Sequence, residues 1–277
     1  MNRMTTRAIF FPFDLFGSAG AKAGAELLAD AFEEMLADNL REKTSTRARA
    51  YAGKVRFEEC TFETLADYQD WREQARTRIH RALQRNEFLL WVTGNHLGAL
   101  PLYEELGRSA KKTLVVQLDA HLDVYNLSDC TSELSYGNFL MHADGPLPPT
   151  INVGHRELLL RPEHISKYYQ AHFPASALAV DEPAMLAKLR AECAVADRVF
   201  VDLDCDAFDP AFFPAVQAPR PFGLTPAFLL RLLAAIGPAR LAGLAISEFD
   251  PARDSNDRCL ETLMWLIEYV LLQKHEA

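Results

Sequence analysis

Two short acidic segments carry the side chains best suited to chemistry in this 277-residue chain. The first is Asp119-Ala120-His121-Leu122-Asp123, which follows an apolar run over residues 114–118 that is typical of a buried parallel strand. Because alternate side chains of an extended backbone share a face, Asp119, His121 and Asp123 are expected to converge on one point. Two carboxylates and an imidazole gathered there are costly unless a positive charge lies among them. The segment therefore predicts a metal ion.

The second segment covers residues 201–210 and reads VDLDCDAFDP. By the same alternation, Asp202, Asp204 and Asp206 share one face of the strand that begins this segment. A second set of carboxylates strengthens the prediction of a metal site.

The rest of the chain alternates between apolar strand-like runs and helical segments. This order predicts an α/β fold with three α/β/α layers, in which helices cover both faces of a mostly parallel sheet. No internal repeat or linker is visible, so residues 1–277 are expected to form a single domain. Strands are predicted at residues 8–13, 55–60, 88–93, 113–118, 151–153, 199–203 and 241–246, and helices at 21–40, 61–84, 97–106, 162–171, 226–236 and 256–273.

Ligands of such sheets bind beyond the carboxyl ends of the strands. His96, Asp119, Asp204, Asp206 and Glu248 all follow predicted strands. Four strand ends should therefore bring metal-binding or cation-binding side chains to one edge of the sheet.

The composition narrows the class of protein. With a net charge of −9, general affinity for nucleic acid or anionic lipid is not expected. The five cysteines are scattered and form no C-x-x-C pair, which fits a reducing, cytoplasmic compartment. Neither a signal peptide nor an apolar run long enough to span a membrane is predicted.

Three separated motifs resemble those of the ureohydrolases, the family of arginase and agmatinase. They are Thr93-Gly94-Asn95-His96-Leu97, the Asp119–Asp123 segment, and Asp204-Cys205-Asp206-Ala207-Phe208-Asp209-Pro210. A later Glu248-Phe249-Asp250-Pro251 is similar to a fourth. The resemblance covers roughly residue 88 to the C-terminus and implies an arginase-like fold. When the third motif is aligned with the family on Asp209-Pro210, Asp204 and Asp206 fall at the ligand positions and Asp202 does not.

The resemblance implies two manganese ions per chain. One would be bound by His96, Asp119, Asp123 and Asp204, and the other by His121, Asp119 or Asp123, Asp204 and Asp206. Four aspartates balance the charge of two divalent ions, and an oxygen-rich set with two imidazoles suits manganese.

The implied reaction is hydrolysis of a guanidino C–N bond, in which activated water attacks the guanidinium carbon and urea and an amine are released. Asp123 would accept the proton of the water and pass it to the leaving nitrogen. Glu248 would face the guanidinium, whose planar fork matches a carboxylate. Tyr136 occupies the place where relatives often carry a proton-shuttling histidine, and it is expected at the rim as a hydrogen-bonding group.

The segment over residues 153–157 lacks an acidic pair of the kind that free-arginine enzymes use. We therefore expect a guanidino substrate other than free L-arginine, with an arginine side chain in a peptide, converted to ornithine, as one option. A homo-oligomer is compatible with the family.

Three alternatives stay open: a hydrolase of agmatine or another small guanidino compound, a deacetylase with one zinc ion, and a non-catalytic binding protein of the same fold. Simpler roles also exist for two residues, because Glu248 could cap the turn before Pro251 and Tyr136 could pack in its loop.

Overall fold

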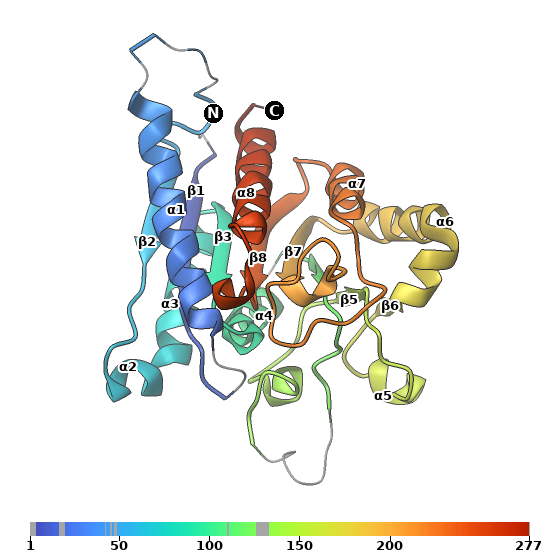
Figure 1. The fold of residues 1–277 in the computed structure, drawn as a ribbon. Helices are drawn as coiled ribbons and strands as arrows, with labels where there is room; N and C mark the ends of the chain where they lie inside the picture. Colours follow the sequence, from blue (N-terminus) through green and yellow to red (C-terminus); the bar gives the residue numbers. More distant parts are fainter. Residues whose placement is uncertain are drawn as a thin grey trace.

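The computed structural model describes residues 4–16, 20–41, 43–44, 46, 49–109, 111–125 and 133–276. Within these residues one eight-stranded sheet has the order β2-β1-β3-β8-β7-β4-β5-β6, and its strand pairs are parallel (Figure 1). The predicted three-layer α/β fold is confirmed. The strands are β1 (Thr6–Phe11), β2 (Val55–Glu59), β3 (Phe88–Thr93), β4 (Thr113–Leu118), β5 (Thr150–Val153), β6 (Ala171–Phe173), β7 (Arg198–Asp204) and β8 (Leu241–Ser247).

Helices cover both faces of this sheet. The α-helices are α1 (Ala21–Arg41), α2 (Leu65–Gln69), α3 (Trp71–Gln84), α4 (Leu100–Arg108), α5 (Pro162–Ile165), α6 (Ala175–Ala194), α7 (Pro226–Ile236) and α8 (Arg258–Glu276). The short 3-10 helices are η1 (His96–Ala99), η2 (Phe139–His142), η3 (Cys205–Ala207) and η4 (Pro251–Arg253). None of the described helices is both long and apolar enough to cross a bilayer.

Strand alternation divides the buried apolar residues into two cores. On β3, Leu90 and Val92 join the core under α1, α6, α7 and α8, whereas Leu89 and Trp91 join the core under α3 and α4. Because both faces are covered, β3, β4 and most of β7 are buried, and their sequences are mostly apolar.

Three predicted helices are divided or shortened in the structure. The segment over residues 97–106 begins as the 3-10 helix η1 and continues as α4. The segment over residues 61–84 is two helices, because Thr64 and Asp67 form a capping box that starts α2 and Asp70 separates α2 from α3. The helix predicted over 162–171 ends at Ile165, and Ala171 starts β6. The small-residue segment Gly17-Ser18-Ala19-Gly20 is typical of a turn, and its first three residues lie outside the described residues.

Strand β6 and helix α6 were missed by the sequence reading. Strand β6 has only three residues, which is too short for an alternation signal. Helix α6 contains Pro183 and is broken at Asp181, whose backbone is non-helical (φ −149°, ψ 74°). The side chain of Asp181 accepts a hydrogen bond from the N–H of Ala184 and so restarts the helix.

Close backbone contacts fix the loops at the carboxyl edge of the sheet. A Cβ at Gly24 of α1 would lie 1.9 Å from the carbonyl oxygen of Phe249, and one at Gly94 would lie 2.3 Å from that of Phe13. Glycine at these positions lets α1 approach Phe249, next to Glu248, and lets the loop after β3 approach Phe13.

Candidate functional site

A cavity of about 210 Å³ lies at the carboxyl ends of the central strands. Asp119 is fully buried and contacts two of the lining histidines. The structure therefore brings together all eight residues that the sequence predicted for the site. The lining residues are His96, His121, Asp123, Tyr136, Asp204, Asp206, Val216, Gln217, Ala218 and Glu248.

One half of the site is centred on the ring of His96. Its Nδ1 lies 2.8 Å from Oδ2 of Asp123 and 3.3 Å from Oδ2 of both Asp119 and Asp204. The Nδ1 atom and the Oδ2 atoms of Asp119 and Asp123 are buried and have no hydrogen-bond partner. Buried polar atoms without a partner are rare, and this set converges on one point, as donors around a cation do.

The other ring nitrogen of His96, Nε2, is held by Asp202. This atom lies 3.0 Å from Oδ2 of Asp202, which also accepts a hydrogen bond of 2.7 Å from the hydroxyl of Tyr103. Burial and the charge of Asp202 raise the pKa of Tyr103 well above its usual value, so its hydroxyl stays a donor. An Nε2–H donated to Asp202 leaves the Nδ1 lone pair facing the cavity, which is the tautomer a metal ligand requires.

The second half of the site is centred on His121. Its Nδ1 lies 2.8 Å from Oδ2 of Asp206 and 3.6 Å from Oδ1 of Asp119. Asp119 thus lies between the two imidazoles and presents one oxygen to each. These residues form two adjacent clusters of His and Asp able to hold metal ions, one with His96, Asp119 and Asp123 and one with Asp119, His121 and Asp206.

The electrostatics of the site require positive charge. Burial and the neighbouring Asp119 raise the pKa of Asp123 to about 7, and burial with Asp206 raises that of Asp204 well above its usual value. Although burial opposes it, Asp119 and Asp206 raise the pKa of His121 to about 12. Protons or metal ions are the available counter-charges, and the carboxylate and imidazole donors fit two divalent cations.

The side chains converge through turns, and the predicted extended geometry was wrong in this respect. Strand β4 ends at Leu118, and Asp123 has a left-handed backbone (φ 50°). The Asp119 carboxylate accepts a hydrogen bond of 2.6 Å from the N–H of His121 and so closes a turn. Similarly, β7 ends at Asp204, whose carboxylate caps η3 by accepting from the N–H of Asp206 at 2.8 Å.

Glu248 reaches the cavity from the end of β8. Its Oε1 accepts a hydrogen bond of 2.8 Å from the N–H of His96, and its backbone is left-handed (φ 64°), a strained conformation for a residue with a side chain. Burial raises its pKa to about 8. The cap before Pro251 is made by Asp250, which accepts from the N–H of Ala252, so the capping alternative for Glu248 is wrong.

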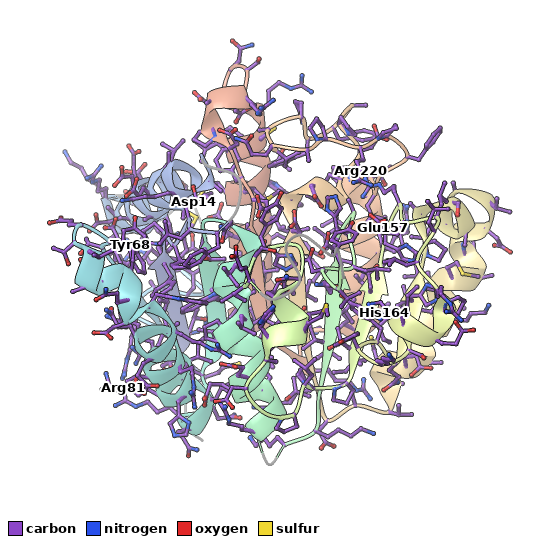
Figure 2. All side chains as sticks on the ribbon, turned by 90° about the horizontal axis from the view of Figure 1, so that it is seen from below. Asp14, Tyr68, Arg81, Glu157, His164 and Arg220 are labelled. Atoms are coloured by element: carbon purple, nitrogen blue, oxygen red, sulfur yellow. The ribbon has the colours of Figure 1, made fainter. Side chains whose placement is uncertain are left out.

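Tyr136 lines the cavity mouth with 41% of its surface exposed, and its N–H donates to the carbonyl of Phe16. A second group of rim residues lies beyond His121. The hydroxyl of Tyr125 donates to Glu157, and Nη1 of Arg220 lies 3.3 Å from the same carboxylate; Figure 2 labels Glu157 and Arg220 at this place.

The sequence did not predict Tyr103 and Tyr125 as site residues. No motif contains either one, and packing of the folded chain brings Tyr103 to Asp202 and Tyr125 to His121. His142, a histidine downstream of the Asp119–Asp123 segment, does not line the cavity.

The support from Asp202 leads to a prediction. Asp202→Asn should weaken metal binding by about 10- to 100-fold, because the amide no longer favours the Nδ1 lone pair of His96. Tyr103→Phe should have a smaller effect, since it leaves the carboxylate in place. The measurement is competitive metal titration of each variant, and equal affinities in Asp202→Asn and the unmodified protein would refute this role.

Comparisons with known proteins agree with this geometry. The model of the arginase family matches residues 7–272. Agmatinase from Proteus mirabilis is 28% identical over 198 residues, which is 70% of this chain and 62% of that enzyme, so the match spans less than two thirds of its length. Agmatinase from Neisseria meningitidis serogroup C is 24% identical over 250 residues, or 89% of this chain and 79% of the enzyme.

Solved structures show the same fold. A hypothetical agmatinase from Burkholderia thailandensis superposes with a TM-score of 0.78 at 20% identity, covering 99% of this chain and 86% of that one. Arginase from Bacillus subtilis gives a TM-score of 0.77 at 18% identity, covering 96% and 98% of the two chains.

Proposed function

The chain belongs to the arginase family, and from this premise we propose that it is a binuclear manganese hydrolase that cleaves a guanidino C–N bond and releases urea. The observation that carries the proposal is the pair of imidazoles that share Asp119, with unpartnered buried donor atoms facing one point. Two agmatinases among the relatives support the same class of reaction.

The metal ligands in this proposal are the five residues of the two clusters together with Asp204. His96, Asp119, Asp123 and Asp204 would hold one ion, and His121, Asp206, Asp204 and Asp119 or Asp123 the other. When bound, such a pair of ions lowers the pKa of water so that it can attack near neutral pH.

The remaining steps fall to side chains of the cavity. Asp123 would take a proton from the attacking water and pass it to the leaving amine nitrogen. The second proton of the water would follow as the C–N bond breaks, so that the guanidinium and water give urea and an ammonium group. Glu248 would pair with the guanidinium through two parallel N–H···O bonds and orient its carbon toward the water. Tyr136, at the mouth, would hydrogen-bond the part of the substrate that leaves as the amine.

The substrate is proposed to be a guanidino compound other than free L-arginine. Within residues 153–157 the single carboxylate, Glu157, already binds Tyr125 and Arg220, so it is not available for an α-amino group. Agmatine is the first candidate substrate, because relatives are named agmatinase. An arginine side chain in a peptide is the second candidate, because Tyr136 at the cavity mouth is partly exposed.

Urea release should separate these substrates. With added manganese, agmatine or an arginine-containing peptide is expected to give a kcat/KM at least ~10-fold above that of free L-arginine, a difference of about 1.4 kcal/mol. A sample treated with a chelator is the control. A strong preference for free L-arginine would contradict the substrate proposal and leave the class of reaction intact. Two bound metals with no hydrolysis of any guanidino compound would favour a binding protein.

We also propose that residues 1–277 form one catalytic domain that works in the cytoplasm and can assemble into a homo-oligomer. One sheet contains the described strands, and the four described cysteines are buried and free, which supports the first two points.

A further inference from the structure

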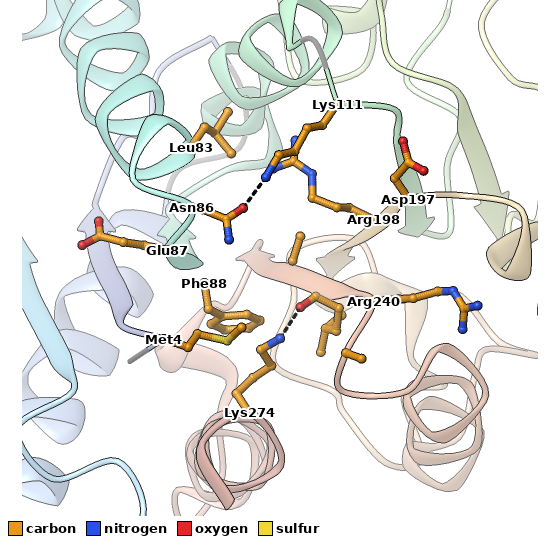
Figure 3. A pocket seen from close by; sticks show the side chains of 13 residues that line it. Met4, Leu83, Asn86, Glu87, Phe88, Lys111, Asp197, Arg198, Arg240 and Lys274 are labelled. Atoms are coloured by element: carbon orange, nitrogen blue, oxygen red, sulfur yellow. Dashed lines mark hydrogen bonds between the residues drawn. The ribbon is translucent and has the colours of Figure 1, made fainter. Parts of the chain in front are cut away.

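A basic groove lies at the amino ends of the central strands, opposite the acidic site at their carboxyl ends. It consists of two cavities of about 440 and 580 Å³ that share Leu83, Asn86, Lys111 and Arg198 as lining residues. The first cavity also contains Arg240 and Lys274. Figure 3 shows this cavity, with Lys111, Arg198, Arg240 and Lys274 around it.

The charge of the groove contrasts with that of the whole chain, which is −9. Six Lys and Arg side chains line it against three carboxylates. One of those carboxylates, Glu87, is already paired with Arg7 and Arg56 from outside the lining, at 2.7 and 3.5 Å. Another, Glu105, pairs with Arg76 and Arg108, both at 3.2 Å, so the remaining positive charge comes from the other four basic residues. The groove therefore concentrates positive charge on an acidic protein. The six basic residues are Arg76, Arg108, Lys111, Arg198, Arg240 and Lys274.

Neutral oxygens hold the cations in the centre of the groove. Nη2 of Arg198 donates to the hydroxyls of Ser109 and Thr113 at 3.1 and 2.9 Å, and Nζ of Lys111 donates to the amide of Asn86 at 2.6 Å. Nε of Arg198 is buried and has no hydrogen-bond partner. A guanidinium whose hydrogen-bond partners are neutral oxygens keeps its positive charge available to an oxyanion in the cavity.

The far side of the first cavity has a further fixed cation. Nζ of Lys274 donates to the carbonyls of Pro238 and Leu241 at 2.6 and 2.8 Å and lies 5.5 Å from the ring centre of Phe88. Since Lys111 and Arg198 line both cavities while Lys274 lines one, the cations are spread along the groove. This spread suits a chain of linked anionic groups better than a single small ion.

The groove is separate from the proposed catalytic site. Strands β7 and β8 begin at groove residues, Arg198 and Leu241, and end at Asp204 and just before Glu248. A ligand in the groove would thus lie a full strand length from the acidic cavity and would not compete with substrate.

We infer that the groove is a binding site for an anion with two or more linked phosphate groups, of the kind carried by a nucleoside di- or triphosphate or by inorganic polyphosphate. Arg198 and Lys111 bind the phosphate groups where the two cavities meet. An extended nucleic acid is disfavoured because the cations lie in a short groove and the chain is acidic as a whole.

The test is a calorimetric titration of the full chain with tripolyphosphate, ATP and orthophosphate. It is run on the metal-loaded protein and again after treatment with a chelator and dialysis, because these anions also bind divalent cations. The variants are Arg198→Gln and Lys111→Gln, and the control is Arg231→Gln, which removes an arginine that pairs with Glu182 on another surface.

Saturable binding of tripolyphosphate or ATP to one site is expected in both forms of the protein. Arg198→Gln and Lys111→Gln should each weaken it at least ~10-fold, with a change below about 2-fold in Arg231→Gln. Lys111 is exposed, so its variant should fold even if Arg198→Gln does not. Equal binding of both phosphate compounds assigns recognition to the phosphate chain, and tighter binding of ATP assigns it to a nucleotide. No saturable binding, or equal affinities in Lys111→Gln and Arg231→Gln, would overturn the inference.

Discussion

Asp119→Asn is expected to lower kcat/KM for urea release by at least ~1,000-fold, equivalent to about 4 kcal/mol of transition-state stabilisation. Asp119 is fully buried and presents one oxygen to each imidazole of the site, 3.3 Å from His96 Nδ1 and 3.6 Å from His121 Nδ1. An amide keeps the shape but loses the charge, so both metal positions are weakened by one substitution.

The measurement pairs urea release with thermal unfolding. Manganese should raise the Tm of the unmodified protein, because a ligand that binds only the folded state stabilises it. Asp119→Asn should lose most of this rise. Asp144→Asn, at an exposed position, is the matched control and should keep both activity and the rise in Tm. A fully active Asp119→Asn would contradict the shared-ligand role.

Glu248→Ala is expected to lower kcat/KM by about 100-fold with little change in metal content. A charge-assisted bond to a guanidinium contributes about 1.5–3 kcal/mol, and a bidentate pair lies at the upper end of that range. The N–H of His96 also loses its acceptor, so Glu248→Gln, which keeps an oxygen there, is the matched variant. Glu248→Gln should retain the fold and lose activity.

Glu248→Gly adds a second readout to this prediction. The left-handed backbone at residue 248 costs roughly 1–3 kcal/mol for a residue with a side chain, and glycine removes most of that cost. Stability in urea should therefore rise or stay constant in Glu248→Gly while activity falls. Full activity in either the alanine or the glycine variant would remove Glu248 from substrate binding.

Much of the sheet could be predicted because its central strands are buried on both faces. Residues 88–93 and 113–118 match β3 and β4 in full, since every position is apolar or buried and the bounds follow from the flanking polar residues. The helix after Thr225 was equally clear, because Thr225 accepts a hydrogen bond from the N–H of Phe228 and Pro226 fills the first turn.

Short or interrupted elements could not be predicted in this way. Strand β6 is three residues long, and the break in α6 at Asp181 removes the helical period on which a sequence reading depends. The strand order is also set by long-range packing, because β8 inserts between β3 and β7 although it comes last in the chain.

For the site, residue types were predictable and their geometry was not. The ligand candidates were found from motifs, and they do meet in one cavity. The alternation argument placed these side chains near one another for the wrong reason, because Asp123 and Asp206 reach the cavity through a left-handed turn and a 3-10 helix. The contact of Tyr103 with Asp202 depends on how α4 packs on β7, and no local pattern contains that information.

Metal content per chain, measured together with urea release after reconstitution with manganese, tests the central claim most directly. Two manganese ions per chain, with hydrolysis of a guanidino compound that is lost on chelation and restored by manganese, is the predicted result. A single bound zinc ion with no release of urea, or full hydrolysis by the metal-free protein, would contradict it.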